Sequence, residues 1–73
     1  MPLSFAEKVK IIMGRRNMSY VDLAAKMGTT RQNVSNKMSK DNFSEDDMKR
    51  IADLLDCDYK GPILKMRDTG EEI

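Results

Sequence analysis

The chain has 73 residues, enough for one domain with a single core, and its 40% apolar and 34% charged residues exclude collagen-like, disordered and disulfide-rich classes. It contains no histidine and one cysteine, Cys57, which excludes an intrachain disulfide, a Cys/His zinc site and a histidine-based catalytic relay. The net charge of +1 is unevenly divided, because residues 1–40 carry eight cations and two anions while residues 41–73 carry five cations and ten anions; such a distribution attracts a polyanion to one part of the chain.

Four helices are predicted in chain order, each starting at a Ser or Thr that is followed three residues later by a side chain able to return a hydrogen bond. The hydroxyl accepts from a backbone N–H of the first turn, and the later side chain reaches back to the N–H of the cap. Apolar residues recur at helical spacing behind each start, which predicts helices over roughly residues 4–16, 19–27, 30–38 and 44–56. The four pairs are Ser4 with Glu7, Ser19 with Asp22, Thr30 with Asn33, and Ser44 with Asp47.

The connection between the second and third helices consists of Gly28 and Thr29. Glycine can adopt the left-handed conformation that closes a helix, and Thr29 leads directly into the next cap. So short a joint predicts a sharp angle between the two helices. The longer loop over residues 39–43 is polar and ends in Phe43, which we expect to pack against the first turns of the fourth helix.

Beyond Cys57 the helical period ends. Residues 59–67 carry no helical stripe, and Pro62 would break a helix interior, so this segment is predicted to be extended. A turn is predicted at residues 68–70. A lone strand is unstable in water, so it must pair either with a second copy of itself or with an edge inside the domain.

No apolar run approaches the roughly 20 residues that a membrane span requires, and the first residues show no basic stretch followed by an apolar one. We therefore expect a soluble protein of a reducing compartment, the cytoplasm.

The second and third helices carry a recognisable pattern over residues 20–34, in which Ala24, Gly28 and Val34 hold the defining positions. Ala24 must be small where the third helix crosses, Gly28 must turn the chain, and Val34 must fill the angle between the helices. This pattern resembles the helix-turn-helix of the phage-repressor/Cro-like (XRE-type) family of DNA-binding regulators. The resemblance implies an all-α fold, a compact four-helix bundle like the lambda-repressor DNA-binding domain, to which this chain adds a short C-terminal extended strand.

The outward face of the third helix is the predicted DNA-reading surface. With Val34 and Met38 buried, the opposite face is polar and mostly uncharged. Amide side chains suit adenine because they donate and accept together, and arginine suits guanine. Since family members read bases from the first exposed positions of this helix, the resemblance implies base contacts by Arg31, Gln32, Asn33 and Asn36, with Ser35 a weaker candidate.

Contacts to DNA phosphates are expected from residues around that helix: Ser19, Tyr20, Thr29, Lys37, Lys40 and Asn42. Tyr20 stands where many family members carry a phosphate-binding glutamine. The acids at the start of the fourth helix suit its dipole and are not expected to bind metal, and no cofactor or catalytic site is expected.

These observations predict a DNA-binding domain over residues 1–57 and an extended tail over residues 58–73. The function they indicate is sequence-specific binding of a double-stranded, near-palindromic DNA operator by a homodimeric transcriptional repressor, phage-borne or from a mobile bacterial element. Dimerisation is assigned to Tyr59, Ile63, Leu64 and Met66 through strand pairing. The alternative is a helix-turn-helix module of antitoxin or anti-activator type that binds a protein partner.

Overall fold

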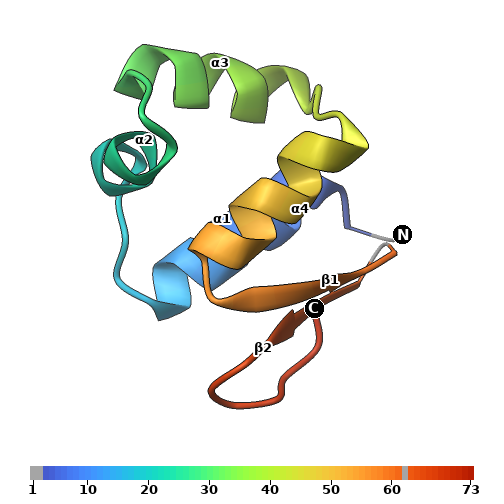
Figure 1. Ribbon diagram of the computed structural model, residues 1–73. Coiled ribbons are helices and arrows are strands. Elements are labelled where there is room, and N and C mark those ends of the chain that lie inside the picture. Colours follow the sequence, from blue (N-terminus) through green and yellow to red (C-terminus); the bar gives the residue numbers. More distant parts are fainter. Residues whose placement is uncertain (1–2, 62) are drawn as a thin grey trace. The chain divides into compact units, whose positions relative to one another are not determined.

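The computed structural model describes residues 3–61 and 63–73 (Figure 1). These residues form α1 (Phe5–Arg15), α2 (Tyr20–Met27), α3 (Arg31–Lys40), α4 (Glu45–Leu54), β1 (Cys57–Lys60) and β2 (Ile63–Met66). The contacts divide the chain into two units, Met1–Asn42 with the first three helices and Phe43–Ile73 with α4 and the strands. None of the described helices is long and apolar enough to cross a membrane.

All four predicted helix starts are confirmed. Ser4, Ser19 and Ser44 form complete capping boxes, and the Thr30 hydroxyl accepts from the Asn33 N–H. Two helix ends differ by two residues from the approximate bounds predicted. α3 continues to Lys40 because Asp41, at φ 50°, supplies the left-handed cap, and α4 stops at Leu54, shortly before Asp56 at φ 58°.

In the first unit the buried side chains form one stripe on each helix. α1 buries Ala6, Val9, Ile12 and Met13, α2 buries Leu23 and Ala24, and α3 buries Val34 and Met38. Burying one large aliphatic side chain contributes about 1.5–3 kcal/mol, so these stripes supply the main stabilisation of this unit. A polar link adds to them, since the Ala6 N–H at the start of α1 donates to Asp41 Oδ1 at the end of α3, at 3.0 Å.

In the second unit the predicted extended segment is a hairpin of two strands and not a single strand. β1 and β2 pair antiparallel, with Cys57 opposite Met66 and Tyr59 opposite Leu64. Gly61, at φ 63°, provides the left-handed residue that the reversal of the chain requires. The expectation for Pro62 lies outside the described residues. The strand therefore finds its partner inside the chain, the second of the two pairings predicted.

The hairpin packs against α4 through its inner face. Cys57, Leu64 and Met66 are buried, as are Ile51, Ala52 and Leu55 from the end of α4. The far edge of β2 is covered by the last residues of the chain, because Leu64 and Ile73 exchange two backbone hydrogen bonds at 3.2 and 2.9 Å and the Met66 N–H donates to the Glu71 carbonyl at 2.8 Å. The second unit thus has a small core and one protected strand edge.

Arg67 connects the parts of this unit on its surface. Its guanidinium donates to Asp58 Oδ1 at 3.0 Å, to Asp53 Oδ1 at 3.1 Å and to Asp56 Oδ1 at 3.5 Å. The hydrogen bonds to Asp58 and then Asp53 raise the pKa of Arg67. Exposed ion pairs contribute little individually, so the value of this network lies in joining α4, β1 and the residue after β2 through one side chain.

Candidate nucleic-acid interface

The joint between α2 and α3 has the geometry that the sequence predicts. Gly28 ends α2 in the left-handed conformation, at φ 71° and ψ 33°. The Thr29 N–H then donates back to the Ala24 carbonyl at 3.0 Å, a hydrogen bond typical of a helix closed by a left-handed residue. Ala24 and Val34 are each 3% exposed. Figure 1 shows the result within this unit, with α2 seen end-on and α3 from the side.

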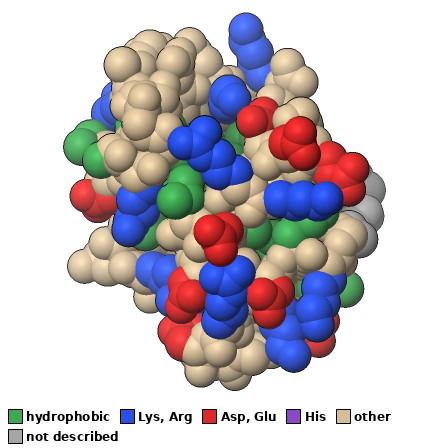
Figure 2. Space-filling model, viewed as in Figure 1, with side chains coloured by type: hydrophobic (Ala, Val, Ile, Leu, Met, Phe, Trp, Pro, Cys, Tyr) green, Lys and Arg blue, Asp and Glu red, His purple; other side chains and the backbone are tan. Residues whose placement is uncertain are grey.

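α3 presents its polar face to solvent. Its buried stripe consists of Val34 and Met38. All four predicted base-contacting residues are exposed: Arg31, Gln32, Asn33 and Asn36. The surface over α3 in Figure 2 is mostly tan, the colour of backbone and uncharged polar groups. The structure thus leaves all four predicted reading residues exposed, with Gln32, Asn33 and Asn36 on the helix face opposite the buried stripe and Arg31 at the first position of the helix.

The amides on this face are hydrogen-bonded to one another or to the preceding turn. Gln32 Nε2 donates to Asn36 Oδ1 at 3.1 Å, and Asn33 Nδ2 donates to Thr29 Oγ1 at 2.8 Å. The second bond corrects an expectation, because Asn33 does not reach back to the cap. Its amide finds an acceptor in the Thr29 hydroxyl, and the Thr30 cap is maintained by its own hydroxyl alone.

The residues predicted to contact phosphate all belong to the first unit. Ser19, Lys40 and Asn42 are exposed, whereas Tyr20, Thr29 and Lys37 are half-buried. This unit carries eight Lys or Arg and three Asp or Glu, a net charge of +5. The residues after Asn42 carry five Lys or Arg and nine Asp or Glu, a net charge of −4. The cationic excess therefore accompanies the exposed face of α3, as a polyanion-binding surface requires.

The start of α2 holds a carboxylate close to where a phosphate contact was predicted. Asp22 Oδ2 accepts from the Ser19 N–H at 2.9 Å and from the Ser19 hydroxyl at 3.0 Å. These two hydrogen bonds lower the pKa of Asp22 below its ordinary value of 3.8, the backbone one most. The Ser19 and Asp22 pair in the sequence predicts this capping arrangement, and the structure shows that both the N–H and the hydroxyl of Ser19 are used in it.

This carboxylate should make the fold sensitive to acid in a defined direction. Because the folded pKa lies below the unfolded one, the ionised group stabilises the fold above pH 3.8, and that contribution is lost as pH falls through the lower, folded value. We expect the Ser19 amide resonance to follow this titration below about pH 4 in NMR spectra. The variant Asp22→Asn, which retains an acceptor oxygen and has no ionisation there, should lack this transition; an identical titration in the variant would refute the assignment.

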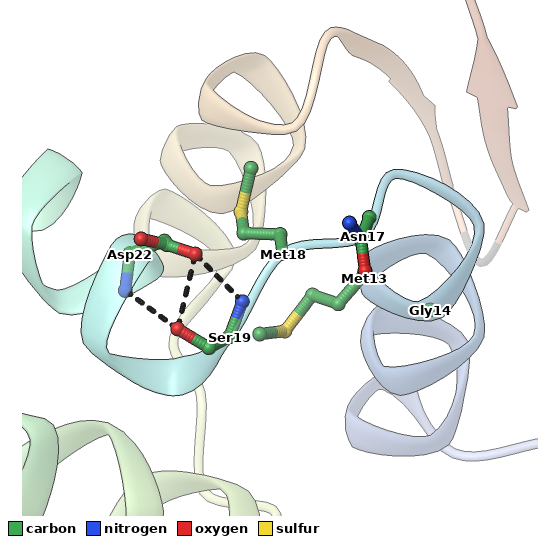
Figure 3. A pocket seen from close by; sticks show the side chains of 6 residues that line it. All are labelled: Met13, Gly14, Asn17, Met18, Ser19 and Asp22. Carbon is green, nitrogen blue, oxygen red and sulfur yellow. Dashed lines mark hydrogen bonds between the residues drawn. The ribbon is translucent and has the colours of Figure 1, made fainter.

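A surface pocket of about 210 Å³ lies beside the same cap. Its lining comprises Met13, Gly14, Asn17, Met18, Ser19 and Asp22. Figure 3 shows the two methionine side chains next to the hydrogen-bonded Ser19 and Asp22. Asp22 is the one titratable group in this lining, and its lowered pKa makes it a weak base, so the pocket offers no pair of groups for acid–base chemistry.

The four residues assigned to dimerisation lie in the second unit, but they do not share one face. Leu64 and Met66 are 0% and 3% exposed within the single chain, and the Tyr59 hydroxyl donates to Met48 Sδ at 3.4 Å. Ile63 is 38% exposed and lies on the opposite face of the hairpin. Leu64 and Met66 are thus part of the chain's own core, which leaves Ile63 as the outward apolar side chain of the group.

Asp41 has a role that the sequence pattern did not predict. It ends α3 and accepts a hydrogen bond from the start of α1, so it fixes the C-terminal end of the candidate reading helix within the first unit. The available signal was the pair Asp41-Asn42, since Asp and Asn are the side chains that most readily follow a helix in the left-handed region.

Comparison with known proteins agrees with this geometry. The model of the Cro/C1-type HTH DNA-binding domain matches residues 8–61, nearly three quarters of the chain. No match was found among curated proteins or among solved structures. The matched region contains the joint at Ala24, Gly28 and Val34 and the whole of α3. The chain therefore belongs to the Cro/C1-type helix-turn-helix family, whose domain binds DNA in transcription regulation.

Proposed function

We propose that this protein is a sequence-specific repressor that inserts α3 into the major groove of double-stranded DNA. The observation that carries the proposal is the exposed face of Gln32, Asn33 and Asn36, held outward by the buried stripe of the same helix, together with the exposed Arg31 at the start of that helix. The major groove is about 12 Å wide and admits an α-helix, and each base pair presents a distinct donor and acceptor pattern there. Amide and guanidinium groups are the side chains that match those patterns.

Phosphate contacts in this proposal come from the same unit: Ser19, Tyr20, Thr29, Lys37, Lys40 and Asn42. These contacts position the helix without specifying sequence. Ser19 must give up a bond to Asp22 in order to take part, because its N–H and hydroxyl are both used there. Lys40 is exposed at the end of α3 and has no such competing role among the hydrogen bonds of the described residues.

The test is selection of duplexes from a random pool at two salt concentrations. We expect one enriched motif, with an affinity that falls linearly on a logarithmic salt scale as counterions are released from phosphates. A protein-binding module seated on apolar surface would enrich no motif and would show weak salt dependence. Absence of an enriched motif at both concentrations would therefore overturn the proposal in favour of that second class.

Lys40→Ala should weaken binding to all duplexes alike. Removing one phosphate-neutralising cation lowers the slope of log affinity against log salt by about one and leaves the order of base preferences unchanged. Binding isotherms on the selected duplex and on a scrambled duplex, each at several salt concentrations, measure both quantities. A changed motif in this variant would instead place Lys40 against a base.

We further propose that the repressor acts as a homodimer on a near-palindromic operator. One unit of this size offers about 600–1,000 Å² of interface with DNA, and two copies on half-sites about 34 Å apart would double it. The outward face of the hairpin at Ile63 supports a subunit contact there, and because residues 71–73 cover the far edge of β2, strand addition would use β1.

Ile63→Lys tests the dimer without touching the buried core. If the hairpin forms the contact, the mass in solution should change from that of two chains to that of one. Leu3→Lys is the matched control, since Leu3 is a similarly exposed apolar residue, 42% against 38%, in the first unit. A dimer that persists in Ile63→Lys, or a monomeric unmodified chain, would contradict the assignment.

A further inference from the structure

Two hydrogen bonds involve the amide side chains of α3. Gln32 donates to Asn36 one helical turn later, and Asn33 donates to Thr29 one turn earlier. Both bonds lie at the exposed surface of the chain, where amide side chains otherwise hydrogen-bond to water. Their presence on the face proposed to read DNA means that these side chains enter the groove already oriented.

The groups that remain on Gln32 define what it can recognise. A glutamine amide has two N–H donors and one carbonyl acceptor, and the bond to Asn36 Oδ1 uses one of the donors. Gln32 therefore retains Oε1 and one N–H. Adenine in the major groove offers N6–H as a donor and N7 as an acceptor, which is the complement of that remaining pair.

Asn36 also disfavours rotation of the Gln32 amide on its own. A rotation of the Gln32 amide by half a turn would place its Oε1 against Asn36 Oδ1, two acceptors without a proton between them. The two amides can exchange donor and acceptor only if both rotate together. The orientation of the Gln32 amide therefore depends on the orientation of the Asn36 amide. A polar residue that hydrogen-bonded only to water would not have this effect.

We infer that Asn36 is a positioning residue that orients the Gln32 amide to read adenine, so that base preference at one operator position depends on both side chains. This inference rests on the proposed function. Holding a flexible side chain in its bound geometry before binding is worth about 2- to 10-fold in affinity, because less side-chain freedom is lost on association.

Four variants separate positioning from direct contact. Gln32→Ala defines the operator position by erasing its adenine preference. Asn36→Ala should reduce that preference about 2- to 10-fold. Asn36→Asp retains an acceptor for Gln32 and should preserve the preference, although its negative charge weakens binding to all duplexes. Ser39→Ala is the matched control, because Ser39 is an exposed polar residue of α3 with no assigned contact to base or phosphate, and its loss should leave the preference at this position unchanged.

The measurement is fluorescence anisotropy on the selected duplex and on the three duplexes that replace the adenine pair, with circular dichroism melting of each variant to confirm folding. The double variant Gln32→Ala with Asn36→Ala should show the same discrimination at this position as Gln32→Ala alone. An unmodified chain that selects no sequence would overturn the proposed function and this inference with it. A selective chain in which Asn36→Ala keeps full adenine preference, or in which Asn36→Asp loses it as Asn36→Ala does, would overturn the inference alone.

Discussion

Gln32→Ala should bind the selected operator about 5- to 150-fold more weakly than the unmodified chain and should lose discrimination at one base pair. A bidentate amide contact to a base is worth about 1–3 kcal/mol of discrimination, and alanine has neither the donor nor the acceptor. The slope of affinity against salt should not change, because no charge is removed. Gln32 is exposed on the helix face opposite the buried stripe, so its removal leaves the core intact.

The measurement is a repeat of the duplex selection with the variant, followed by binding isotherms on single-base changes. Lys40→Ala serves as the contrast, since its loss should appear in the salt slope and not in the motif. Retention of the full motif by Gln32→Ala would mean that the outward face of α3 is not the reading surface, and the functional proposal would then have to be abandoned.

Gly28→Val should destabilise the fold by about 2 kcal/mol or more. The left-handed conformation costs a residue with a Cβ about 1–2 kcal/mol, and a β-branched side chain fits it worst. Gly28 has φ +71°, and a Cβ built there would meet no atom within 4 Å, so the cost arises from the backbone and not from a collision. Thermal denaturation should show a decrease in Tm of about 10 °C or more for a chain of this size.

Gly14→Ala provides the matched control for this result. Gly14 lies in α1, has no left-handed φ, and a Cβ there would also meet nothing within 4 Å. Replacing a helical glycine with alanine should raise stability by about 0.5–1 kcal/mol. Equal Tm values for the unmodified chain and Gly28→Val would show that α2 does not need a left-handed residue in order to close.

The helix starts could be predicted from the sequence because a cap is a local structure. Each pair of residues, three positions apart, contains both the capping hydroxyl and the side chain that can hydrogen-bond back to the N–H of the cap. No contact with a distant part of the chain is needed. Thr30 shows the limit of this reasoning. Its hydroxyl caps α3 as predicted, but the side chain of Asn33 turned to Thr29, a choice between two nearby acceptors that spacing alone does not decide.

The hairpin was harder to predict because its two strands are only four residues each. Residues 59–67 indicate extended backbone, but whether such a segment runs straight or reverses depends on one left-handed residue, Gly61, and on burial against α4. Leu64 and Met66 were for this reason predicted to contact a second copy of the chain, whereas in the structure they are buried in the core of their own chain. Their burial depends on tertiary contacts between the hairpin and α4, and the sequence pattern of the strands alone does not predict such contacts.

The candidate site was predictable to the level of a helix face and not to that of individual hydrogen bonds. Val34 and Met38 identify the buried stripe of α3, so the exposed residues follow from helical geometry. The bond between Gln32 and Asn36 depends on rotamers of exposed side chains, which sequence spacing permits but does not require.

The pairing of residues 71–73 with β2 has a practical consequence for anyone who shortens this protein. Without these three residues the Leu64 and Met66 N–H groups would lose the acceptors that they now have in Ile73 and Glu71. The exposed edge of β2 could then form backbone hydrogen bonds with the same edge of a second molecule. Truncated protein should therefore be prone to aggregation. Affinity tags are for this reason better joined through a flexible spacer after Ile73 than in place of the final residues.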